Sequence, residues 1–247
     1  MTKVRLIKSL WREGTILTPS SEDPKHPATD TQIDTKAQFW KASGTSTPIT
    51  VPCNLGTAQE IDSVIILGHN LPSGTTVQFE GADNSGFTTG LITRTLTWNA
   101  NNIFAFITAF TKRYVRLKAS GTFTVAPQVA TILCGKYFQP SRTFVKSYSK
   151  GREDFSEFEY SDSINLFGQD KPVLKKWNLP FKGLSNSDIT SVLSFLESCK
   201  TIKAFVVVFD YNNPNTDSHL VRFTELVSPT YEHVDNWNWE ALLIEVK

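Results

Sequence analysis

Few cysteines and almost no net charge characterise this 247-residue sequence, and both absences exclude classes of protein. Its three cysteines, Cys53, Cys134 and Cys199, include no Cys-x-x-Cys pair. A disulfide-stapled secreted domain has more cysteine, and a zinc site needs more closely spaced ligands. The formal net charge is +1, whereas a protein that neutralises nucleic-acid phosphates usually has a larger basic excess. We therefore expect free thiols in a reducing compartment and no nucleic-acid specificity, with a Cys53–Cys134 pairing left open.

The sequence also lacks the features of a targeting segment or a membrane anchor. From Met1 to Trp11, charged side chains interrupt the apolar residues. This pattern is typical neither of a signal peptide nor of a membrane span. We expect a protein that is made and folded in the cytoplasm and is not inserted into a membrane.

Aromatic residues, by contrast, are abundant and lean towards phenylalanine and tryptophan, with 17 Phe and 6 Trp against a single Met. This composition favours β-structure over a helical bundle. A chain of 247 residues can form one large all-β domain or two smaller domains that each bury a core.

The segment 60–81 is typical of two β-strands joined by a structured loop. Val64–Leu67 is an apolar, largely β-branched run with the length of a buried strand. Thr76–Glu80 alternates polar and apolar residues, as a half-buried strand does. The glycines, asparagine and proline of residues 68–74 supply turn geometry between the two. The segment fits the inner strands of a β-sandwich.

Further short strands, at roughly ten-residue spacing, complete an antiparallel β-sandwich. The clearest is 113–119, where Tyr114, Arg116 and Lys118 alternate with Val115, Leu117 and Ala119. Other strands are expected at 3–10, 15–17, 49–56, 91–98, 103–107 and 129–138. Residues 18–37 contain three prolines and almost no large apolar side chain, so we expect no regular element there, only an extended arm or a loop lying over the surface.

This succession of segments resembles the discoidin-like jelly roll, in the version carried by tail proteins of tailed bacteriophages. The resemblance covers residues 38–138 and is carried by Phe39-Trp40, Val51–Gly56, Ile61–Leu71, Val77–Gly81, Arg113–Leu117 and Ile132–Gly135. It implies an N-terminal discoidin-like β-sandwich over residues 1–138. Cell-surface discoidin domains often close with a disulfide, and no cysteine pair flanks this one, which suits assembly in the cytoplasm.

From Gln139-Pro140 onwards the composition changes, which predicts a second domain over residues 141–247. Lys175–Phe181 alternates as a strand does. Residues 189, 192, 193 and 196 have helical apolar spacing, and Asn186 or Ser187 can cap this helix. Strands expected at 204–210, 220–227 and 237–246 complete a second sheet.

The order of elements in this second half resembles the ring-forming domain of phage distal tail and minor tail proteins, whose relatives are the tail-tube proteins. The resemblance covers residues 141–247 and includes Val221-Arg222-Phe223, Pro229–Tyr231, Trp237–Trp239 and Leu243. It implies a tail-tube-like β-sandwich or roll with one flanking α-helix. It also implies a homo-oligomeric ring, a hexamer, that contacts the tail tube and tail hub.

No pattern of residues typical of catalysis or of a metal site is found. His69 and Asn70 have no sequence neighbours that could complete a catalytic or metal-ligand set. The sequence also lacks a nucleophile elbow, a glycine-rich phosphate loop and a His-Glu-x-x-His helix. The acidic residues between Glu153 and Glu159 lack a calcium-loop pattern. We predict a non-enzymatic protein without catalytic residues, metal or cofactor.

Two groups of residues are candidates for binding. Trp98, followed by Asn99 and Asn101, is next to an expected loop and could stack on a sugar ring, although core packing is an equal alternative. Trp237 and Trp239 share one strand face and would anchor either a core or a subunit interface, where Trp is enriched.

The sequence therefore predicts a structural virion protein of a phage tail tip, a distal or minor tail protein. It would form a ring at the end of the tail tube and display an outward β-sandwich. The alternative is a carbohydrate-binding adsorption module that contacts a host surface glycan, and both can hold together. A glycan hydrolase would need two positioned carboxylates, and no such pair is evident.

Overall fold

The computed structural model of the protein describes residues 3–35, 37–100, 102–145, 149–160, 166–169 and 171–246, with the backbone alone at 157–160 and 166–169. The chain divides into two compact units. The N-terminal unit comprises residues 5–138 and 208–218, and the C-terminal unit comprises 1–4, 139–207 and 219–247. The domain boundaries expected from the sequence, 1–138 and 141–247, stay predictions. None of the helices in the described part of the chain is long and apolar enough to cross a membrane.

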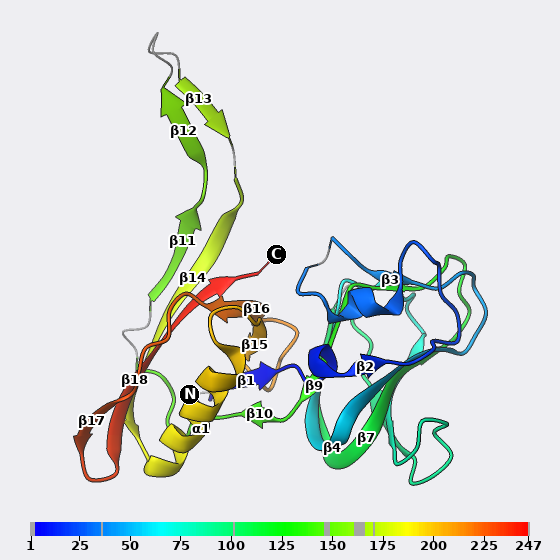
Figure 1. Cartoon of the computed structure of the whole chain (residues 1–247), viewed down its shortest axis with the longest axis horizontal. Coiled ribbons are helices and arrows are strands. Elements are labelled where there is room, and N and C mark those ends of the chain that lie inside the picture. Colours follow the sequence, from blue (N-terminus) through cyan, green and yellow to red (C-terminus); the bar gives the residue numbers. More distant parts are fainter. Residues whose placement is uncertain are drawn as a thin grey trace. The chain divides into compact units, whose positions relative to one another are not determined.

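The N-terminal unit is a β-sandwich, as expected from its alternating strands (Figure 1). Its main sheet has the strand order β2-β4-β7-β5-β6, with β9 also paired to β4. The strand β3 pairs with β8 in a separate two-stranded sheet, and β1 pairs with β10. The elements are β1 (Arg5–Lys8), η1 (Trp11–Glu13), β2 (Thr15–Ile16), η2 (Ala28–Gln32), β3 (Trp40–Lys41), β4 (Ile49–Leu67), β5 (Thr76–Ala82), β6 (Ile92–Leu96), β7 (Asn102–Ser120), β8 (Gln128–Val129), β9 (Thr131–Gly135) and β10 (Tyr137–Phe138).

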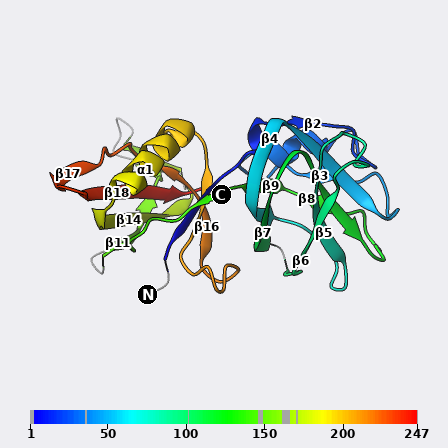
Figure 2. The same cartoon turned by 90° about the horizontal axis from the view of Figure 1, so that it is seen from below.

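Two strands of 19 residues each, β4 and β7, form the framework of this sandwich. They pair along nearly their whole length, and the register shifts between Asn54 and Gln59, where Gly56 has a φ of +81°. Residues on both sides of this shift, such as Val51 and Val64, are buried in the same core. The same two strands therefore contribute to both halves of the sandwich, and their curvature is visible in Figure 2.

The segment 18–37 has more structure than expected, because it contains the 3₁₀-helix η2. The indole of Trp11 is fully buried and its Nε1 donates to Thr31 Oγ1 at 3.0 Å. Gln32 Nε2 donates to the carbonyl oxygens of Trp11 at 2.7 Å and Gly14 at 2.8 Å. The expectation of an arm or a loop without a regular element was wrong, because tertiary hydrogen bonds to Trp11 replace the apolar side chains that the segment lacks.

Residues 208–218 group with the N-terminal unit through contacts that the sequence does not reveal. The Arg5 guanidinium lies 4.0–4.2 Å from the ring centres of Phe106, Tyr137 and Tyr211. Asn215 Oδ1 accepts a hydrogen bond from the Phe104 amide at 3.0 Å. The contact of Arg5 with the three rings and the hydrogen bond between Asn215 and Phe104 thus attach the segment 208–218 to the N-terminal unit, from which it is distant in sequence.

The C-terminal unit is a sheet with one α-helix among the described residues, as the sequence predicts. Its strand order is β15-β16-β18-β14-β11, with β17 also paired to β18. The helix α1 lies across this sheet in Figure 2, and its Phe195 ring centre is 5.0 Å from that of Phe205. The elements are β11 (Ser149–Asp154), β12 (Glu157–Tyr160), β13 (Leu166–Gln169), β14 (Val173–Leu184), α1 (Asn186–Cys199), β15 (Phe205–Val208), β16 (Ser218–Phe223), β17 (Thr230–His233) and β18 (Asn236–Glu245).

A two-stranded ribbon projects from this sheet. The strand β14 pairs with β18 only from Lys176 onwards, and before that residue it pairs with β11. Beyond them β12 pairs with β13, and Figure 1 shows this part of the ribbon extending away from the rest of the C-terminal unit. A two-stranded ribbon by itself is marginally stable in water, so this one is a candidate for contact with another molecule.

The helix α1 starts with a capping box, one residue earlier than expected. Ser185, not Asn186 or Ser187, is the N-cap: its Oγ accepts from the Asp188 amide at 3.2 Å, and Asp188 Oδ2 accepts from the Ser185 amide at 3.1 Å. Asp188 also accepts from the amide and hydroxyl of Ser141. Burial by itself raises the pKa of Asp188, but the hydrogen bonds from Ser141 and Ser185 outweigh it and hold the pKa below 3.8.

We expect Asp188→Asn to lower the free energy of unfolding by about 1 kcal/mol at neutral pH, because it weakens the cap. Ionised Asp188 stabilises the fold fully above pH 3.8, and this contribution is lost as the pH falls through its lower folded-state pKa. Chemical denaturation of both proteins between pH 7 and pH 3 should therefore show curves that converge in acid. Glu197→Gln, on the exposed side of the same helix, is the control. Equal curves for the two variants would contradict the role given to Asp188.

Candidate functional site

One face of the N-terminal sheet holds an ordered row of charged and hydroxyl side chains. In the register of the sheet, Arg116 on β7 is opposite Glu80 on β5, which is opposite Thr93 on β6. In the adjacent row, Lys118 is opposite Gln78, which is opposite Thr95. Side chains alternate along a strand, so these residues share the face opposite to the core residues Val115, Leu117 and Phe79. We call this surface the outer face.

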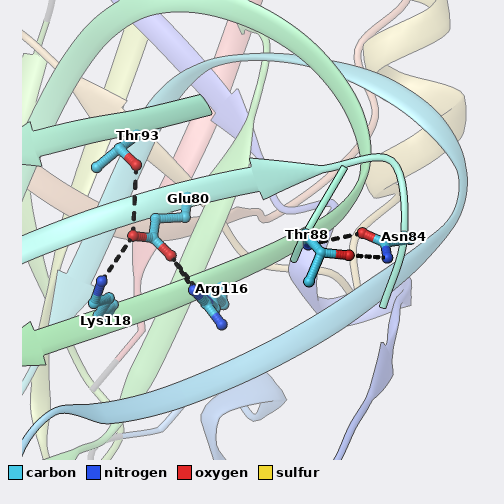
Figure 3. Close-up of polar contacts among 6 residues, drawn as sticks. All are labelled: Glu80, Asn84, Thr88, Thr93, Arg116 and Lys118. Atoms are coloured by element: carbon cyan, nitrogen blue, oxygen red, sulfur yellow. Dashed lines mark hydrogen bonds and ion pairs between the residues drawn. The ribbon is translucent and has the colours of Figure 1, made fainter. Parts of the chain in front are cut away.

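Glu80 is the buried centre of the outer face, with 2% of its surface exposed (Figure 3). Arg116 contacts Glu80 Oε2 through Nε and Nη2, both at 2.6 Å, and Lys118 Nζ contacts Oε1 at 3.1 Å. Thr93 Oγ1 is 3.5 Å from Oε1. A buried carboxylate is costly unless it is paired and hydrogen-bonded, and here two cations satisfy it.

The loop 83–91 is held over this cluster. The Phe87 ring is centred 4.2 Å from Arg116 Cζ, and Phe87 has a φ of +54°, which is rare for a bulky residue. Asn84 Oδ1 accepts from the amides of Thr88 and Thr89 at 3.0 Å each, and Asn84 Nδ2 donates to Thr88 Oγ1 at 2.7 Å (Figure 3). Backbone strain of this kind costs roughly 1–3 kcal/mol and often marks a functional site.

The base of the same loop is fixed by an ion pair. Lys112 Nζ contacts both carboxylate oxygens of Asp83 at 2.8 Å. Gly90 has a φ of +60°, and a Cβ atom there would collide with Asp83 Oδ2, so any other residue would be strained and would displace the ion pair. The outer face is therefore bordered by a loop with a defined conformation, which keeps Phe87 against Arg116.

Trp98 and Asn99, which the sequence suggested as glycan-contacting residues, are not part of the outer face and form hydrogen bonds with residues of another loop. The half-buried Trp98 packs against the core, and its Nε1 donates to the Leu71 carbonyl at 3.0 Å. The Asn99 carbonyl is 2.9 Å from His69 Nε2. Asn101 lies outside the described residues. Both described candidates thus have structural contacts, and sugar stacking on Trp98 stays untested.

His69 is a neutral structural residue in this arrangement. The Leu71 amide donates to Nδ1 at 3.2 Å, so the ring proton is on Nε2 and is donated to the Asn99 carbonyl. Burial lowers the pKa of His69 below 6.5, and the hydrogen bond to Asn99 opposes this only in part. The imidazole therefore connects two loops.

The two tryptophans of β18 differ in their surroundings. Trp239 is 3% exposed, stacks on Phe181 with ring centres 5.3 Å apart and donates to the Val227 carbonyl at 3.2 Å. Trp237 is half-buried, and its Nε1 donates to Asn186 Oδ1 at 2.8 Å. Trp239 therefore belongs to the core of its own unit, and of the pair only Trp237 has surface to offer to a neighbouring subunit.

The cysteines are buried free thiols, and no acidic or thiol-rich cluster forms a metal site in the described residues. Cys53 Sγ lies 3.8 Å from the Trp11 carbonyl, and burial raises its pKa to about 12. Burial raises the pKa of Cys134 as well. Glu153 is paired with Lys176 at 2.8 Å. Across the described ranges, no three His, Cys, Asp or Glu residues are placed to hold a metal ion.

No protein-family model matches the sequence, and no curated protein matches it. Solved structures with a similar fold include chitosan-binding module 1 of a chitosanase/glucanase from Paenibacillus sp. IK-5, with 20% identity and a TM-score of 0.46 over 52% of this chain and 98% of the module. Module 2 of that enzyme, solved with chitotriose, has 17% identity and a TM-score of 0.44 over 51% and 99%. The family 32 carbohydrate-binding module of Clostridium perfringens NanJ, solved with galactose, has 17% identity and a TM-score of 0.43 over 53% of this chain and 98% of the module.

These structures are carbohydrate-binding modules, and nearly all of each module is matched by about half of this chain. With TM-scores below 0.5 and identities of at most 20%, the likeness says nothing about a ligand of this chain. The mainly-β class expected from the sequence is confirmed by the described strands. The relation to phage tail proteins stays a prediction.

The outer-face cluster was not identified from the sequence, although part of its signal was present. Alternation places Arg116 and Lys118 on the side opposite to Val115 and Leu117. Alternation does not predict the ion-pair partner of Arg116. Glu80 is 36 residues away in sequence and contacts Arg116 only because β5 pairs with β7.

Replacing His69 with alanine should reduce the free energy of unfolding by about 1–3 kcal/mol, because the Leu71 amide and the Asn99 carbonyl lose their partner. Since the folded-state pKa is below 6.5, wild-type stability should fall as the pH drops from 6.5 through that pKa. The variant should lack this part of the pH dependence. Thermal unfolding at pH 7.5 and 5 would measure both effects, with the exposed His233→Ala as control. An unchanged pH profile in His69→Ala would contradict this role.

Proposed function

We propose that this chain is a non-catalytic attachment protein whose N-terminal unit binds a saccharide on the outer face. The observation that carries the proposal is the rigid row of hydrogen-bonding groups on β7, β5 and β6, which the sandwich core does not use. Thr93 and Thr95 are exposed, Gln78 is half-buried, and Arg116 is oriented by Glu80 and Phe87. A few well-placed polar groups beside an aromatic ring are typical of ligand sites, and a polyhydroxylated ligand offers matching donors and acceptors.

Binding without cleavage is the activity that these groups support. Glycoside hydrolysis requires two carboxyl groups on either side of the scissile bond, one to donate a proton and one to attack or activate water. On the outer face Glu80 is neutralised by Arg116 and Lys118, and Asp83 at its border is held by Lys112. Neither carboxylate has the environment of a general acid or a nucleophile.

The screen for this function uses the full chain against a panel of neutral and acidic oligosaccharides, with calorimetry as the readout. We expect at least one ligand to bind, and Thr93→Tyr to weaken it by about tenfold or more, because the larger ring covers the row. Val125→Tyr, at a residue 64% exposed in the same unit, is the matched control and should leave binding intact. Absence of binding across the panel would contradict the proposal, as would equal effects of the two variants.

We propose secondly that the C-terminal unit assembles into a ring. If the chain is a tail-tip protein, the ring contains six copies and belongs to a phage-like tail that is assembled in the host cytoplasm. The support for this proposal is the set of large apolar side chains that this unit leaves exposed, because an interface with a neighbouring subunit would remove them from water. The most exposed are Val234 at 82% and Ile202 at 79%, and others are Tyr231, Leu193, Leu226, Val173 and Phe155. The projecting ribbon adds an open strand edge at β11.

Sedimentation and negative-stain electron microscopy of the full chain should reveal a closed ring. The double variant Ile202→Glu, Val234→Glu should shift the population towards monomer, because charges oppose burial at an interface, while the thermal midpoint stays unchanged. Val125→Glu in the N-terminal unit is the matched control. The proposal fails if the chain is a monomer in solution and a single copy outside the tube in assembled particles.

A further inference from the structure

The outer face has an excess of positive charge. Arg116 and Lys118 share the single carboxylate of Glu80, and Lys112 and Asp83 at the border neutralise each other. The cluster of Arg116, Lys118 and Glu80 therefore carries one net positive charge. The surface therefore attracts anions, even though the whole chain carries a formal charge of only +1.

Both central cations have donors left over. Arg116 uses Nε and Nη2 towards Glu80, and its other guanidinium hydrogens have no protein acceptor among the described residues. Lys118 uses one of its three N–H groups for Glu80. Their side chains are 21% and 28% exposed, so the remaining donors border solvent. They can bind a ligand acceptor without breaking the contacts to Glu80.

Glu80 makes these donors rigid and cannot itself serve as an acceptor for a ligand. With 2% of its surface exposed and both oxygens paired with cations, it is a positioning residue. Phe87 restricts the guanidinium from the other side through the 4.2 Å stacking contact. Arginine held in one plane recognises the two oxygens of a carboxylate or phosphate better than a freely rotating side chain does.

We infer that the ligand of the outer face is an anionic saccharide, whose carboxylate or phosphate group binds Arg116 and Lys118 while its hydroxyls contact Thr93, Thr95 and Gln78. This inference rests on the proposed saccharide-binding function and adds the chemical class of the ligand. A neutral sugar would leave the one positive charge that Glu80 does not balance without a counter-charge. A cationic sugar such as a glucosamine polymer would meet repulsion from Arg116 and Lys118.

The test compares ligands that differ only in charge. Calorimetry on the full chain would use oligogalacturonate with its methyl ester, and a hexose phosphate with inorganic phosphate alone, which separates carboxylate from phosphate sources. We expect an acidic saccharide to bind about tenfold or more tightly than its neutral counterpart, with an affinity that falls as salt rises. Lys118→Gln should reduce the preference for the acidic form and leave weak binding of the neutral form. Lys136→Gln, at an exposed lysine of the same unit, should change neither.

The outcomes separate the two proposals. Equal binding of charged and esterified saccharides, unaffected by Lys118→Gln, overturns the anionic preference while saccharide binding stands. Binding of inorganic phosphate as tight as that of any acidic saccharide means an adventitious ion only, and also overturns it. If no saccharide in the panel binds, the proposed function fails and this inference fails with it. Because all comparisons between ligands use the unmodified chain, a variant that does not fold leaves the result decisive.

Discussion

The pairing of β4 with β7 is the constraint on which the N-terminal unit depends. Each strand has 19 residues, and the ladder between them continues past a register shift near Gly56. Because both strands bend together, their inward residues meet in one core, and β9, β2 and β5 join them at the edges that remain. Loss of this ladder would remove the core and the outer face together, since Arg116 and Lys118 are on β7.

The outer face shows how such a ladder produces the surface for which we propose ligand binding. One side of an antiparallel sheet packs on the core and the other is available to solvent. At the centre of the available side, a nearly fully buried carboxylate pairs with two cations on the neighbouring strand. A buried ion pair rarely stabilises a fold more than well-packed apolar residues do. Its consequence here is that the guanidinium and the ammonium are held in place, which would reduce the entropy lost in the proposed binding of an anion.

The C-terminal unit depends on a different interaction, the hydrogen bonds around Asp188. This carboxylate caps α1 and also accepts a hydrogen bond from the Ser141 amide, so it connects the start of the helix to the beginning of the segment 139–207. The helix then covers β15, a strand buried along its whole length. The apolar side chains left exposed elsewhere in this unit are the physical basis for proposing assembly.

Sequence periodicity by itself determined the mainly-β class, the strand 113–119 and the helix near 189–196, because each depends on neighbours a few residues apart. Tertiary structure decided what depends on distant residues. Residues 28–32 are ordered by their hydrogen bond to Trp11, and Trp239 is buried against Phe181. The indole of Trp98 donates a hydrogen bond to the Leu71 carbonyl in a loop. The tertiary structure also brought Glu80 to Arg116, because strand pairing joins residues that no local pattern relates. Local spacing specifies which face a side chain takes, and only the paired sheet specifies what it meets there.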